Sequence, residues 1–122
     1  MQEITKPERV IEILERIKPK VIRTKVIFRQ WPSGEVIALF PELAADMVGN
    51  LCMSYQRVGQ HGSALPFHVI KETEMVRMIS GETKDLFDEL VSLGYDLDVR
   101  YRVSWEMNEA RMQDSKRFWS EG

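Results

Sequence analysis

The side chains best suited to chemistry gather in one short stretch, residues 51–62. This stretch holds the single cysteine, one of the two histidines, a tyrosine and two glutamines: Cys52, Tyr55, Gln56, Gln60 and His61. A cysteine becomes a nucleophile when a neighbouring imidazole takes its proton, so Cys52 with His61 would suit a small hydrolase or transferase. Tyr55 could assist in place of the thiol. Gly59 and Gly62 flank the histidine and allow the backbone to approach a ligand closely.

The pattern along residues 51–58 is that of a β-strand, and it separates these groups. Alternate side chains of a strand point to opposite faces. Small and polar side chains share one face, at Cys52, Ser54 and Gln56, and bulkier ones share the other, at Leu51, Met53, Tyr55 and Arg57. An extended strand also carries residue 58 about 20 Å from Cys52, so the loop must fold back before this thiol can meet His61. We therefore expect a buried structural cysteine and assign no catalytic residue.

Tyr55, Gln56, Gln60 and His61 form instead a predicted ligand-binding set. Aromatic walls with a few convergent polar groups are usual in ligand pockets, and two tryptophans, Trp31 and Trp105, could extend the walls. The alternative for the aromatic residues is an ordinary place in the core.

Metal and nucleotide sites lack support in the sequence. His61 and His68 are seven residues apart, which matches no zinc template even if Glu42 or Asp46 supplied a carboxylate. The glycines are scattered, and none belongs to a phosphate-binding loop. We predict no metal and no cofactor.

Size and composition favour one compact domain over residues 1–122. The chain has a mass of 14.3 kDa, with 43% hydrophobic and 30% charged residues. A single cysteine excludes an intramolecular disulfide. No apolar run reaches the roughly 18 residues of a membrane span, and no signal peptide is evident at the N-terminus. The expected location is the cytoplasm.

The charge balance argues against nucleic acid as a partner. The chain has 17 basic and 19 acidic residues, a net charge of −2 and a pI near 5.7. Five cations could share a sheet face, namely Arg23, Lys25, Arg29, Arg100 and Arg102. Asp96 and Asp98 would partly cancel their field, so we expect a solvated face and keep nucleic-acid binding as the weaker alternative.

The sequence predicts a helix, four strands, a second helix, a fifth strand and a helical tail. A capping box at Thr5 and Glu8 predicts a helix over about 6–18, and Ser80 and Gly94 bound a second one. Strands are predicted at residues 21–29, 35–40, 51–58, 67–70 and 96–105, with Pro41 ending the second. The tail, about 106–120, is expected to be helical over part of its length.

This order, α-β-β-β-β-α-β-(α), predicts an α+β domain with a largely antiparallel five-stranded sheet and helices packed on one face. The first three strands should form a meander, since their connections are short. Residues 36–40 are apolar on both faces, which predicts a central strand. The last strand could either cross over in parallel or return to the sheet edge.

Apolar side chains in exposed-looking segments predict self-association. Phe118 and Trp119 end a polar tail, and Met75 and Met78 lie in a connection. The tail could fold back onto the domain or dock on a second copy, and we expect a homodimer.

Three segments resemble an uncharacterised family of small bacterial proteins associated with phage, plasmid and other mobile-element gene neighbourhoods. The segments are VIFR (26–29), GEVIALFPE (34–42) and CMSYQRVGQHG (52–62), within a resemblance that spans about residues 24–103. The resemblance implies the strand order and carries no activity or ligand. The function predicted is a binding or adaptor module for a protein or small molecule, with a hydrolase or transferase as the alternative.

Overall fold

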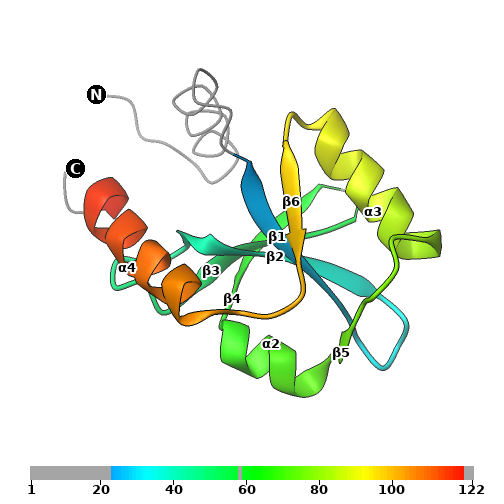
Figure 1. Cartoon of the computed structure of the whole chain (residues 1–122), viewed down its shortest axis with the longest axis horizontal. Helices are drawn as coiled ribbons and strands as arrows, with labels where there is room; N and C mark the ends of the chain where they lie inside the picture. Colours follow the sequence, from blue (N-terminus) through cyan, green and yellow to red (C-terminus); the bar gives the residue numbers. More distant parts are fainter. Residues whose placement is uncertain (1–22, 58, 120–122) are drawn as a thin grey trace.

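The computed structural model describes residues 23–57 and 59–119, which form an α+β domain built on a mostly antiparallel sheet (Figure 1). The helix predicted over about 6–18 lies outside the described residues.

Four consecutive strands form an antiparallel meander, as the short connections predicted. They are β1 (Thr24–Gln30), β2 (Val36–Ala44), β3 (Cys52–Gln56) and β4 (Gln60–Ala64). The turn between β1 and β2 is closed by the Trp31 amide, which donates to the Glu35 carbonyl at 2.8 Å. Gly34 has a φ of +97°, a conformation that side chains disfavour. The meander places β2 at the centre, as its two apolar faces predicted.

Two further strands share the outer edge of β1. The short β5 (Glu74–Met75) pairs antiparallel with Arg29 and Gln30, and β6 (Leu97–Arg100) pairs in parallel with residues 24–27. Helix α3 (Gly81–Ser92) connects them. Over the described residues the sheet therefore has six strands rather than five, and the last strand returns to the sheet edge, where it runs parallel to β1.

Three predicted elements were wrong in type or extent. Residues 67–70 lie in helix α2 (Pro66–Glu72) because Pro66 occupies its first turn, where a missing N–H costs nothing, and the fourth strand is β4 instead. The last strand ends at Arg100 because β5 already occupies the next positions along β1. Strand β2 continues past Pro41 through a register shift between Phe40 and Ala44.

The chain then turns into helix α4 (Trp105–Trp119), so the predicted helical tail is confirmed. Trp105, expected at the end of a strand, begins this helix.

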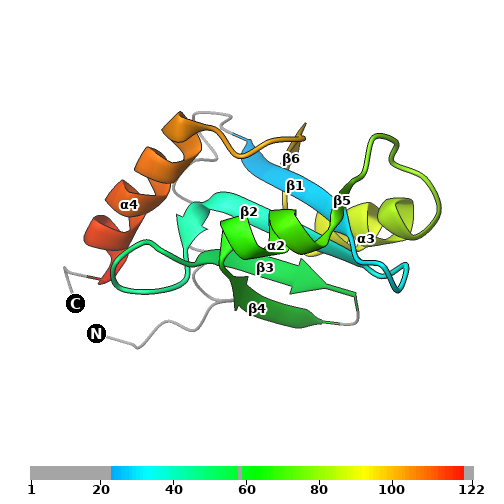
Figure 2. The same ribbon diagram turned by 90° about the horizontal axis from the view of Figure 1, so that it is seen from below.

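Helices cover both faces of the sheet, which corrects the prediction of one covered face (Figure 2). Helix α3 packs Leu86 and Leu90 against the face formed by Val26, Phe28, Ala38, Phe40, Met53 and Tyr55. Val69 of α2 and Met107 of α4 pack on the other face, against Ile27, Ile37, Leu39 and Cys52. The polar side of the last strand predicted that one face of the whole sheet is solvated. This strand, β6, lies at an edge, however, and β1 and β2 are apolar on both sides.

A buried arginine attaches α2 to the sheet. Arg29 of β1 is 7% exposed, and its guanidinium donates to Thr73 Oγ1 at 2.9 Å, the Thr73 carbonyl at 2.7 Å and the Ile70 carbonyl at 3.0 Å. These carbonyls end the helix and would otherwise lack partners. Arg29 is therefore a helix cap and no part of a solvated basic face.

We expect R29M to lower the free energy of unfolding by about 2 kcal/mol or more, because each hydrogen bond to a charged group contributes about 1.5–3 kcal/mol. The measurement is urea unfolding followed by circular dichroism. The matched control is R100M in neighbouring β6, where the arginine is half-exposed and pairs with Asp98; its loss should be much smaller, because exposed ion pairs contribute little to stability. Equal losses in the two variants would contradict the capping role of Arg29.

Candidate functional site

The β3–β4 hairpin brings the predicted binding residues together as cross-strand pairs. Tyr55 pairs with His61, and Gln56 pairs with Gln60, at the closed end of the hairpin. Paired residues of antiparallel strands place their side chains on the same face. The predicted set is thus one local unit in the backbone, with the side chains of Tyr55 and His61 on one face of the sheet and that of Gln56 on the other.

Tyr55 and His61 lie on the face covered by α3. Their rings meet edge to face, with centroids 4.6 Å apart and planes at 70°. The Tyr55 hydroxyl donates to the Glu89 carboxylate of α3 and accepts the Gly59 amide at 3.0 Å. Burial raises the pKa of Tyr55, and Glu89 adds to the effect by accepting its proton. Tyr55 therefore holds the hairpin turn against α3.

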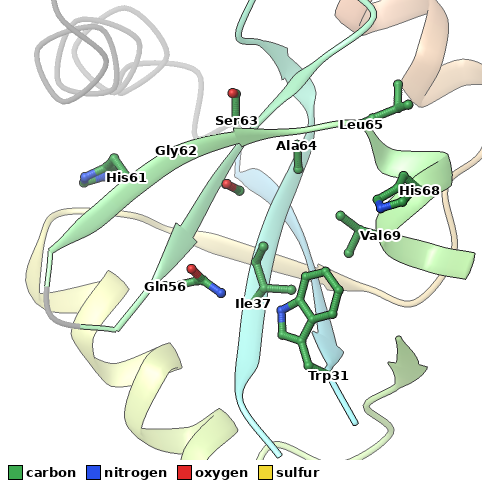
Figure 3. Close-up of a pocket in the computed structure, with 11 residues that line it drawn as sticks. Trp31, Ile37, Gln56, His61, Gly62, Ser63, Ala64, Leu65, His68 and Val69 are labelled. Atoms are coloured by element: carbon green, nitrogen blue, oxygen red, sulfur yellow. The ribbon is translucent and has the colours of Figure 1, made fainter. Parts of the chain in front are cut away.

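Gln56 lies on the opposite face, beside α2, where a groove opens. The groove has a volume of about 610 Å³, and its lining includes Trp31, Ile37, Ser54, Gln56, His68 and Val69. Figure 3 shows Trp31, Ile37, Gln56 and Val69 turned toward the same hollow. His61 also belongs to the lining of the groove, but its ring points away from the hollow. We call this site the β3–α2 groove.

Small residues on the hairpin create the space. Gly62 lies opposite Ser54, and a Cβ at Gly62 would stand 3.3 Å from the serine Oγ. Ala64 continues the strand, and Leu65 and Pro66 then turn the chain into α2, which forms the far wall. The groove therefore has a floor of small side chains between a tryptophan on one side and a helix on the other.

His68 and Ser54 were absent from the predicted binding set. The sequence pattern predicts a strand at residues 67–70 and so does not direct His68 to the binding set, whereas its position in α2 places it in the lining of the groove. The Leu65-Pro66 step was the available signal, since proline in a first turn favours a helix start. Of the two tryptophans predicted as walls, Trp31 lines the groove, and Trp105 is largely exposed at the start of α4.

Cys52 and His61 lie on opposite faces of the sheet. Cys52 is fully buried with the α2 and α4 side of the core, and burial raises the pKa of its thiol to about 12. A thiol of this kind is not ionised at neutral pH. The sheet itself separates it from the His61 ring, so the two side chains do not form a nucleophile and base pair.

The remaining charged candidates, apart from Arg102, are engaged locally. Glu42 pairs with Lys25 at 3.0 Å, Arg23 pairs with Asp96 at 3.1 Å, and Asp46 accepts the Gly49 and Leu51 amides. Arg100 lowers the pKa of Asp98 by hydrogen bonding to it. Over residues 23–57 and 59–119, no group of three or more histidine, cysteine or acidic residues could hold a metal ion. None of the helices in these ranges combines the length and the apolar character that a transmembrane span requires.

No family model matches the chain, and no curated protein or solved structure matches it either. The resemblance to a mobile-element family stays a prediction, and arguments about function depend on the geometry of the site.

The pKa of Cys52 predicts a loss of stability at alkaline pH. In the unfolded chain a thiol ionises near pH 8.5, whereas in the folded protein it stays protonated to about pH 12. The stability due to this difference is complete below about pH 8.5 and falls by up to about 1.4 kcal/mol per pH unit above it. We expect urea unfolding between about pH 8 and 10 to show this slope in the native protein and a smaller one in C52A. Parallel slopes would contradict the assignment to Cys52.

Proposed function

We propose that this protein is a small binding or adaptor module that holds a neutral, hydrogen-bonding ligand, either a protein segment or a small molecule, in the β3–α2 groove. The observation that carries the proposal is the lining of this groove. Trp31, Ile37 and Val69 supply apolar walls, and Gln56 and His68 supply polar groups. Apolar walls with a few placed polar groups are the usual composition of ligand sites.

The chemistry of the lining selects the class of ligand. Among the described residues that line the groove, none is an aspartate, glutamate, lysine or arginine. The Gln56 amide can donate and accept, the Ser54 hydroxyl can do both, and the Trp31 indole can only donate. Such a set complements a group with both a carbonyl and an N–H, such as a peptide or other amide. A ligand with a full charge would meet no opposite charge there.

The enzymatic alternative has weaker support. A hydrolase using His61 needs an assisting group on the same face, but Cys52 is buried on the other face as a neutral thiol. The Tyr55 hydroxyl is already bonded to Glu89 and Gly59. These arrangements favour a stabilising role for the side chains around His61.

Self-association is the second part of the proposal, with another copy of the chain as partner. Phe67 of α2 is 76% exposed and Trp105 of α4 is 72% exposed. The two helices that carry them pack on the same face of the sheet. Large aromatic side chains are enriched in protein interfaces and are unusual on the free surface of a small monomer. We propose that this aromatic pair lies in a homodimer interface.

The groove is tested by NMR titration of the protein with short peptides and amide-containing fragments. A ligand found in this way should bind Q56A and H68A about fivefold to tenfold more weakly, the effect of losing a hydrogen bond of about 1 kcal/mol or slightly more. H61A is the matched control: His61 belongs to the lining, but its ring packs against Tyr55 and points away from the hollow. Binding that is lost in H61A and kept in H68A would reject the groove and move the site to the Tyr55 face.

The homodimer is tested by native mass spectrometry at low micromolar concentration. The native protein should have twice the chain mass, and the F67Q/W105Q variant should have the mass of one chain, because two aromatic contacts are lost. V91Q is the control, as Val91 is 47% exposed on α3, on the other side of the sheet. A monomeric native protein, or a dimer that survives F67Q/W105Q, would contradict this interface.

A further inference from the structure

A second pocket, separate from the β3–α2 groove, opens where β5 and β6 meet on the edge of β1. It has a volume of about 330 Å³ and is lined by Met75, Arg77, Tyr101 and Arg102. Two guanidinium groups and an aromatic ring thus line one small hollow. No local sequence motif predicts this combination, since the two arginines are 25 residues apart in the chain.

The pairing of the strands explains why these residues meet. Arg100, the last residue of β6, pairs with Ile27, and Met75, the last residue of β5, pairs with Arg29. The two strands approach each other from opposite ends of the same edge and must both leave it beside Phe28. The segments that follow them carry Arg77 on one side and Tyr101 and Arg102 on the other. The convergence is therefore built into the sheet.

The two arginines of the pocket differ from most others in the described chain. Arg23, Arg57 and Arg100 each pair with an aspartate, and the buried guanidiniums of Arg29 and Arg111 bind carbonyl groups. Arg77 and Arg102 are exposed, and neither has a hydrogen-bond or ion-pair partner among residues 23–57 and 59–119. Their donors are available to a ligand.

We propose that this pocket binds a small organic oxyanion, with its phosphate or carboxylate group between Arg77 and Arg102 and an attached planar group against Tyr101. The planar fork of a guanidinium matches both kinds of oxyanion. Tyr101 is 44% exposed, so it has free surface for a ligand, and Met75 adds an adaptable apolar contact. The proposal is independent of the groove and of its ligand.

The charges around the pocket are compatible with an anion. Asp98, on neighbouring β6, is held by Arg100 through two hydrogen bonds, at 3.0 and 2.9 Å. Glu74 precedes Met75 in β5, and successive side chains of a strand point to opposite faces. Neither carboxylate lines the pocket. Two cations in one hollow are too few for an extended nucleic-acid surface, which makes a small ligand the better match.

The test is a two-dimensional NMR titration of the full chain with phenyl phosphate, benzoate and inorganic phosphate. We expect phenyl phosphate or benzoate to shift the amide signals of Met75 and Tyr101, and the one that binds more tightly identifies the oxyanion. R77Q and R102Q should each weaken that binding about tenfold, the effect of a charge-assisted hydrogen bond. Y101S should weaken phenyl phosphate or benzoate more than inorganic phosphate, because only the former two carry a ring.

The control is R117Q, which removes an exposed charge near the end of α4, at the opposite side of the domain from β5 (Figure 1). Binding weakened equally by R117Q, R77Q and R102Q would show a general charge effect and overturn the proposal. So would an absence of shifts at Met75 and Tyr101 at millimolar ligand in a protein whose spectrum shows it folded. A single-stranded oligonucleotide that binds far more tightly than phenyl phosphate through the same two arginines would also overturn it, in favour of a nucleic-acid partner.

Discussion

The outer edge of β1 is the constraint from which much of this structure follows. This strand has seven residues, and two strands compete for their hydrogen bonds. Because β5 takes the positions at Arg29 and Gln30, only Phe28 separates it from the end of β6 opposite Ile27. The strand-like pattern that runs on to Trp105 therefore ends early, and the chain is free to cross the sheet and begin α4. The same competition creates the pocket lined by Arg77 and Arg102.

Buried guanidinium groups attach both helices on the groove side of the sheet. Arg29 reaches from β1 to the last carbonyls of α2, and Arg111 reaches from α4 to the carbonyls of Pro41 and Gly49 at 2.8 Å each. Gly49 accepts the close approach of α4, since a Cβ there would stand 3.0 Å from the Met112 Cα. Burying a cation is favourable only when its donors are satisfied, so these bonds specify where each helix lies. The position of α2 in turn sets the width of the β3–α2 groove.

Local sequence patterns were sufficient to predict those elements for which the apolar pattern and the residues at the ends indicate the same structure. The strand at residues 36–40 is apolar on both faces and is central in the sheet, and α3 follows directly after Ser80 and ends before Gly94, whose φ is +107°. The alternation of residues 52–56 also placed Cys52 and Tyr55 on opposite faces, as the core shows. Burial of an apolar stripe and the backbone freedom of glycine act over a few residues, which is why the sequence reveals them.

Contacts between segments far apart in the sequence decided the features that local patterns did not predict. The helical state of residues 66–72 depends on packing Val69 beneath the sheet and on Arg29 from a strand about 40 residues earlier, and no local pattern contains that partner. The predicted binding residues were found as a hairpin, yet their division into a Tyr55 side fixed to α3 and a Gln56 side open to the groove required both helices in place. Arg77 and Arg102 line the same pocket only because β5 and β6 share the edge of β1. Amino-acid patterns thus specified which residues are buried and which strands are local neighbours, whereas long-range hydrogen bonding and packing specified where polar side chains converge.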